Sequence, residues 1–186
     1  HFWRWELLTV SIKWYYTGFN FSNVSVCVLP EPRYLALASG EFMETLMGFP
    51  QLNLSAFASG RVVPIEDVPD PVFAGRMMGD GVAIDPVRSA GQGVLGAPCA
   101  GRITQLHSSR HACFLETENG ARLLLHIGVD TVLLKGEGFV TRVAQGDVVR
   151  AGQTLIEFDI DLLKRHGKPA IVILVVENSD DFRIAS

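Results

Sequence analysis

From residue 52 onward, the hydrophobic positions of this chain follow one pattern: short apolar runs alternate with turns that contain glycine, proline, asparagine or aspartate. Short apolar runs bounded by such turn residues are typical of β-strands. Several of them at close spacing favour an antiparallel sandwich or barrel. The sequence therefore predicts an all-β fold, an antiparallel β-sandwich or barrel with short helical turns. The predicted strands are 61–65, 82–84, 102–106, 113–117, 122–127, 154–158 and 170–176, and the predicted helical turns are 71–78 and 161–168.

One stretch of the chain echoes another. Residues 56–62 read AFASGRV and residues 97–103 read APCAGRI, and the apolar positions Ile65 and Leu106 follow at the same offset. Two copies of one strand–turn unit are too few for a solenoid. They indicate a sandwich whose two halves are related by approximate symmetry.

Residues 1–51 differ from the rest. They are rich in aromatic residues, among them Trp3, Trp5, Trp14, Tyr15 and Tyr16, and they contain no functional motif. We expect two parts: an N-terminal extension, 1–51, of unknown role, and a domain, 52–186, that carries the function.

Composition narrows the class of protein. The net charge of −4 makes a nucleic-acid partner unexpected, because such binders usually present a basic surface. The three cysteines form no CxxC pair, which argues against a disulfide framework or a cysteine zinc site and favours a reducing compartment. The longest clean apolar run, 170–176, is far shorter than the ~20 residues of a membrane-spanning helix. We therefore expect a cytoplasmic protein.

A single histidine interrupts the most apolar of the predicted strands. Residues 123–131 read LLLHIGVDT, and His126 shares a strand face with Leu124. Partial burial disfavours the charged imidazole, and the neutral ring is a nucleophile. The alternative is a core histidine that is hydrogen-bonded to the backbone.

A second histidine favours the reactive interpretation. His111 opens the preceding run, and the turn 118–120, which contains Asn-Gly, joins that run to the His126 strand. A hairpin centred there would place the two imidazoles nearly opposite each other. One ring could then attack a phosphoryl group while the other donates a hydrogen bond to its oxygens. Alternatively, both could bind zinc, with Asp130 as the third ligand and water as the fourth.

Four segments resemble, in order, the glucose-type IIA family of the bacterial phosphoenolpyruvate-dependent sugar phosphotransferase system. They are 63–73 (VPIEDVPDPVF), 79–84 (GDGVAI), 126–132 (HIGVDTV) and 134–139 (LKGEGF). The resemblance runs from about residue 52 to 182 and is most specific around His126. It implies a β-sandwich of the duplicated hybrid motif type and a phosphotransferase component that needs no cofactor. Such a domain accepts a phosphoryl group from HPr and passes it to the IIB domain of a sugar permease, and it reaches the membrane only through that permease.

The resemblance also assigns roles to residues. It implies that His126 is the phosphoryl acceptor, that His111 stabilises the phosphate, that Ser109 orients His111 and that Asp130 is the acidic neighbour of the site. Ile127 stands where the family often has phenylalanine. The sequence of residues 55–85 most resembles that of IIA domains at the N-terminus of fusions with HPr and enzyme I. The residues expected to dock partner proteins are apolar: Phe73, Met77, Met78, Leu124 and Val132.

Two other classes of protein stay open at this point. Residues 143–155 resemble the hairpin of biotinyl and lipoyl carrier domains, but Lys135, in the one lysine-bearing glycine-rich turn, lacks the usual methionine beside it. A zinc peptidase on a β-sandwich would need a His-x-His pair, and the chain has none. His107 and His166 are expected to be isolated surface residues. The sequence does not indicate which sugar is transported.

Overall fold

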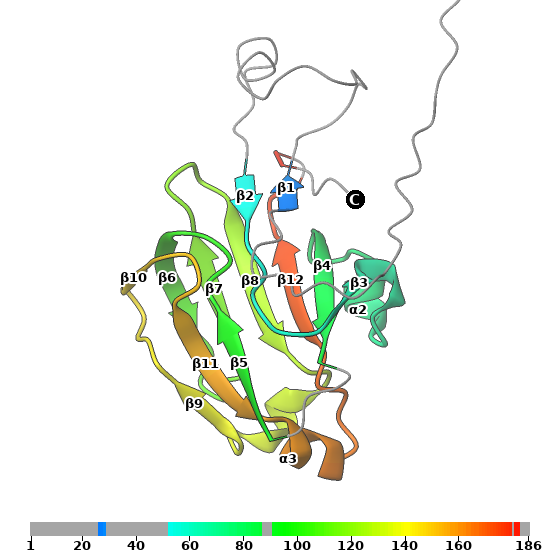
Figure 1. The fold of residues 1–186 in the computed structure, drawn as a ribbon. Helices are drawn as coiled ribbons and strands as arrows, with labels where there is room; N and C mark the ends of the chain where they lie inside the picture. The colour runs from blue at the N-terminus through cyan, green and yellow to red at the C-terminus, as the bar shows by residue number, and fades with distance from the viewer. Residues whose placement is uncertain (1–25, 29–51, 87–90, 180, 183–186) are drawn as a thin grey trace, which may run out of the picture.

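The computed structural model describes residues 26–28, 52–86, 91–179 and 181–182. Two antiparallel sheets form its layers, seen in Figure 1. The larger sheet has the strand order β10-β6-β7-β8-β12-β4-β3, and the smaller has the order β5-β11-β9. The strands of the larger sheet are β3 (Arg61–Pro64), β4 (Asp80–Asp85), β6 (Gly101–Leu106), β7 (Ala112–Glu116), β8 (Arg122–Ile127), β10 (Val148–Val149) and β12 (Val172–Val176). The strands of the smaller sheet are β5 (Gln92–Gly96), β9 (Phe139–Thr141) and β11 (Thr154–Asp159). The predicted all-β sandwich is confirmed.

The remaining elements are short. A separate pair of strands joins β1 (Val26–Val28) to β2 (Leu52–Leu54). The helical segments are η1 (Ile65–Asp67), α2 (Pro71–Ala74), η2 (Thr131–Leu134) and α3 (Ile160–Arg165). Among the helices in the described ranges, none has the length and apolar character needed to cross a membrane. Apart from β1, the predicted extension 1–51 lies outside the described residues.

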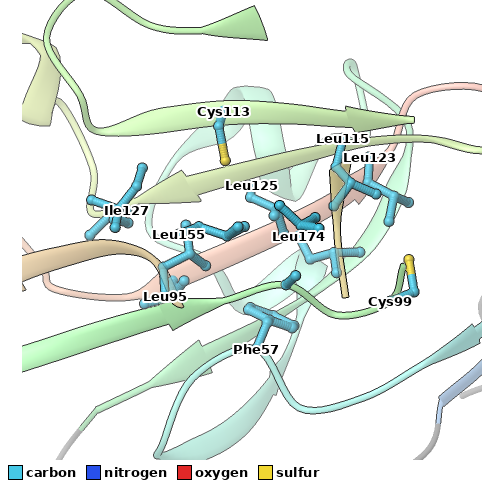
Figure 2. Packing of buried hydrophobic residues seen from close by; sticks show 14 of the residues in the cluster. Phe57, Leu95, Cys99, Cys113, Leu115, Leu123, Leu125, Ile127, Leu155 and Leu174 are labelled. Carbon is cyan, nitrogen blue, oxygen red and sulfur yellow. The ribbon is translucent and has the colours of Figure 1, made fainter. Parts of the chain in front are cut away.

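The main core fills the space between the two sheets. Figure 2 shows its side chains converging from both layers, with Leu115, Leu123 and Leu125 on the larger sheet and Leu95 and Leu155 on the smaller one. All five are fully buried. Cys99 and Cys113 also lie here as free thiols, and burial raises the pKa of each to about 12.

A second apolar layer covers the outer face of the larger sheet. It arises because β8 and β12 are buried on both faces: odd-numbered residues of β8 enter the main core, whereas Leu124 points outward. The cover comes from η1 and α2, which contribute Ile65 and Phe73. The α2 helix begins where the Asp70 carboxylate accepts a hydrogen bond from the Val72 amide, with Pro71 as its first residue. This outer layer is the part of the fold that positions the histidines.

The two copies of the sequence echo occupy equivalent positions. Arg61 pairs with Asp85, the last residue of β4, and Arg102 pairs with Glu116, the last residue of β7. A side chain added at Gly60 or Gly101 would clash with the carbonyl of that same partner residue. Each copy therefore needs its glycine for the same close approach between strands.

The sequence misjudged some boundaries and missed some strands. The helical turn predicted at 71–78 is helical only to Ala74, because Arg76 has a positive φ of 54° that ends regular helix. The turn predicted at 161–168 is α3, which ends at Arg165. Strands β2, β5, β9 and β10 were not predicted, because they are short or carry exposed polar residues.

Candidate active site

His126 lies in the middle of the outer face of the larger sheet. In the strand register it sits between Ala112 of β7 and Ile173 of β12, and the same row continues to Ala83 and Val63. The other four members of this row are buried and apolar. His126 is therefore a polar residue set into an apolar row, and its ring is half-buried rather than enclosed.

The hairpin of β7 and β8 brings the second histidine to the first, as the sequence predicted. Ala112 pairs with His126, so His111 lies one position before β7, and its carbonyl accepts a hydrogen bond from the Ile127 amide. The ring centroids of His111 and His126 are 4.7 Å apart, with an interplanar angle of 83°. Phe73 of α2 also contacts His126, with ring centroids 5.1 Å apart.

A third histidine belongs to the site, which corrects the prediction that His107 is an isolated surface residue. The His107 ring is half-buried, and its centroid is 4.6 Å from that of His111. The Ser109 hydroxyl lies 2.8 Å from Nδ1 of His107 and 2.8 Å from Nδ1 of His111. No direct signal in the sequence indicates this contact, because residues 107–111 form a turn in which Arg110 has a positive φ of 57°. His166 is exposed at the end of α3, as predicted.

Burial keeps both central imidazoles neutral at neutral pH. Burial is the largest cause that lowers the pKa of His126 to about 4; the Gly128 backbone and the Asp70 carboxylate act in the opposite direction, and His107 lowers it further. For His111, burial and then the neighbouring imidazoles of His126 and His107 lower the pKa to about 3. A neutral imidazole keeps one nitrogen lone pair for attack or for accepting a proton.

Asp130 and Asp70 differ in their surroundings. Asp130 has an exposed side chain whose Oδ2 lies 3.4 Å from Nζ of Lys168. The carboxylate that influences His126 is Asp70, which the sequence analysis did not select, because an aspartate before a proline reads only as a helix cap. No group of three histidine, cysteine, aspartate or glutamate side chains in the described residues could hold a metal ion. Asp130 therefore does not complete a zinc site with His111 and His126.

The residues expected to dock partners divide into two groups. Met77 is 75% exposed, and Met78 and Val132 are also exposed. Phe73 is buried, and Leu124 is only 5% exposed, so these two support the surface from below rather than form it. The exposed apolar residues that accompany α2 and η2 also include Val72 and Leu133, which the sequence analysis did not select.

Two neutral histidines in ring contact, one of them partly exposed on the outer face of the larger sheet, can carry a group on an imidazole. Comparisons with known proteins agree. A profile of the family described as phosphoenolpyruvate-dependent sugar phosphotransferase system, EIIA 1, matches residues 52–182. The chain therefore belongs to this family, and it is a phosphocarrier domain of a sugar phosphotransferase system.

Individual relatives support the same assignment. The chain is similar to the PTS system glucose-specific EIIA component of Bacillus cereus, with 48% identity over 122 residues that cover 66% of this chain and 72% of the relative. It is also similar to the component of that name in Halalkalibacterium halodurans, with 46% identity over 126 residues, 68% of this chain and 70% of the relative. Among solved structures, the glucose permease IIA from Mycoplasma capricolum matches with a TM-score of 0.61 and 33% identity, over 68% of this chain and 79% of that one. The comparisons support neither the zinc-peptidase nor the biotinyl or lipoyl alternative.

Proposed function

We propose that His126 accepts a phosphoryl group from the phosphohistidine of HPr and passes it to a cysteine of a IIB domain. In the first step a phosphorus–nitrogen bond forms to His126, and the HPr imidazole leaves with the electron pair of the bond that breaks. In the second step the cysteine thiolate attacks, and His126 leaves in the same way. The observation that carries this proposal is the contact between two neutral imidazoles, of which His126 is partly exposed.

The burial of the ring nitrogens suggests which one reacts. Nδ1 of His126 is buried, and no described residue gives it a hydrogen bond of normal geometry. We therefore assign the nucleophile to the other ring nitrogen, Nε2, of this partly exposed residue. A proton held on Nδ1 toward the Gly128 backbone would leave the lone pair on Nε2.

His111 would stabilise the phosphate with an N–H donor, and Ser109 would orient it. Phosphoryl transfer depends on positioning and on stabilising negative charge, and a donor at contact distance supplies both. The 2.8 Å contact from Ser109 to Nδ1 supports this orienting role. Asp130, exposed and paired with Lys168, would place charge where an approaching partner meets the domain.

Partners would dock on the exposed apolar residues Met77, Met78 and Val132, with Phe73 and Leu124 beneath them. Methionine side chains repack easily, which suits a surface that must accept both HPr and a IIB domain. We place the protein in the cytoplasm, where both partners would reach it, and assign its contact with the membrane to the permease. No cofactor takes part in either step.

Phosphorylation in vitro tests the proposal. With phosphoenolpyruvate, enzyme I and HPr, the wild-type domain should gain one acid-labile, base-stable phosphate, and the His126→Ala variant should gain none. His166→Ala is the matched control, because it removes an exposed histidine at the end of α3 and should label fully. Full labelling of His126→Ala would rule the assignment out.

A further inference from the structure

The third histidine competes with His111 for one proton. The turn that joins β6 to β7 is closed by two backbone hydrogen bonds, from the Arg110 amide to the His107 carbonyl and from the His107 amide to the Ala112 carbonyl. Arg110 holds a positive φ of 57° within it. This turn fixes Ser109 between two imidazole nitrogens, each 2.8 Å from its hydroxyl oxygen. A hydroxyl has one proton, so it can donate to only one of them.

The backbone settles which nitrogen receives the proton. The Ser109 amide donates to Nδ1 of His107 over 3.2 Å, so this nitrogen carries a lone pair. The hydroxyl must then share this one lone pair with the amide as a second donor, because two lone pairs would otherwise face each other at 2.8 Å. The oxygen is left as an acceptor for His111, whose Nδ1 must carry a proton. Since burial keeps the His111 ring neutral, its Nε2 is bare.

We propose that His107 is a positioning residue that selects the tautomer of His111 through the Ser109 hydroxyl. In the resting protein the chain of donors runs from His111 to Ser109 to His107. Donation from Nε2 of His111 to a phosphate, which rests on the function proposed above, requires this chain to run in reverse.

The reversal is balanced in protons. The Nδ1 proton of His111 passes to the Ser109 oxygen, and the Ser109 hydroxyl proton passes to Nδ1 of His107. His111 takes up one proton at Nε2 from water, and His107 releases one from Nε2 to water. Both rings end neutral, each with its proton on the other nitrogen. His107 thus holds the site in a form that does not donate until a phosphoryl group arrives.

The tautomer can be measured without any phosphorylation. Nitrogen-15 NMR of the imidazoles distinguishes a protonated ring nitrogen from a bare one. In the wild-type protein at neutral pH we expect His111 to carry its proton on Nδ1. His107→Phe removes the competing acceptor, so Ser109 should donate to His111 and move the proton to Nε2. The same tautomer in wild type and His107→Phe would overturn the proposal.

A second variant shows whether the effect passes through Ser109. In a Ser109→Ala background, the His107→Phe change should no longer alter the His111 tautomer; an undiminished change would also overturn the proposal. His166→Phe is the control and should leave the His111 signals unchanged. Because these spectra are of the unphosphorylated protein, they stand even if His126 proves not to be the acceptor.

The rate of phosphoryl transfer from phospho-HPr measures how the His111 tautomer affects function. Freeing His111 to donate should raise the rate of transfer from phospho-HPr in His107→Phe by about two- to tenfold, the equivalent of one ordinary hydrogen bond. A folded His107→Phe variant with a shifted tautomer and a slower transfer would contradict the inhibitory direction that we assign to His107.

Discussion

The two faces of strand β8 differ in their surroundings: one faces the main core, and the other carries His126. Leu123, Leu125 and Ile127 point into the space between the sheets and are fully buried by apolar neighbours from both layers. Leu124 and His126 point outward, where η1 and α2 form a thinner cover and His111 enters the layer. Because side chains alternate along the strand, residues that stabilise the core stand directly next to residues that belong to the candidate site. The inner face excludes polar groups, and the outer face keeps them neutral and within reach of the surface.

Substitutions of the adjacent residues Leu125 and His126 should show the largest difference between the two faces. We expect His126→Ala to lose phosphorylation completely while the free energy of unfolding changes by no more than about 1 kcal/mol. We expect Leu125→Ala to lose about 2–5 kcal/mol of stability, because it opens a cavity between the sheets. Denaturant unfolding and a phosphorylation assay on both variants check the pair. A large stability loss in His126→Ala would mean that the outer face is also a structural core.

On the outer face, substitution of His111 should affect a different transfer step from substitution of His126. His111→Gln keeps a donor group but loses the ring, so the variant should still be phosphorylated by HPr. We expect it to pass the group to IIB about 10²-fold more slowly, the usual cost of losing a donor aimed at developing charge. Rapid-quench kinetics of the second transfer measure this. Wild-type speed in that step would make His111 a structural residue.

Lowering the pH should reduce the stability that the two histidines of the outer face contribute. The pKa of His126 and that of His111 are lowered to about 4 and about 3, so between these values and 6.5 the unfolded chain binds more protons than the folded one. Their contribution to stability is therefore complete above pH 6.5 and is lost as the pH falls. Between pH 7 and 5 we expect the wild type to lose on the order of 2 kcal/mol more than His126→Ala does. Equal losses in urea titrations at the two pH values would argue against buried, neutral rings.

The smallest expected effect concerns docking. Met78→Asp places a charge on the exposed apolar surface beside α2, and it should slow both transfers by about tenfold through the cost of desolvating that charge. Val140→Asp is the matched control, since Val140 is a similarly exposed apolar residue on the smaller sheet. We expect it to transfer at the wild-type rate. If the two variants behave alike, the docking surface does not lie at Met78.

The sequence predicted the parts of the molecule that depend on local periodicity. Strand β8 was predicted at 122–127 and is found at Arg122–Ile127, because its apolar run is bounded by clear turns. The Asn-Gly turn gave the hairpin register closely enough to join His111 to His126. These features follow from neighbours in the chain.

The sequence could not predict contacts that depend on how a turn closes or how a helix is packed. His107 reaches His111 only because Arg110 adopts a positive φ, and arginine gives no signal for that conformation. The Asp70 carboxylate raises the pKa of His126 because α2 packs on the sheet, and the sequence of α2 does not specify that packing. Leu124 was expected at the docking surface, yet the cover from η1 and α2 leaves it buried.

The position of β12 affects when the larger sheet can be completed during synthesis of the chain. This strand is the last of the described strands, yet it lies between β8 and β4 in the middle of the larger sheet, and all five of its residues are buried. Ile173 supplies one of the two strand neighbours of His126. Chains emerge from the ribosome at about 5–20 residues per second, so β8 waits several seconds for this neighbour. Until residue 172 has followed, His126 therefore lies on a strand with one side unpaired.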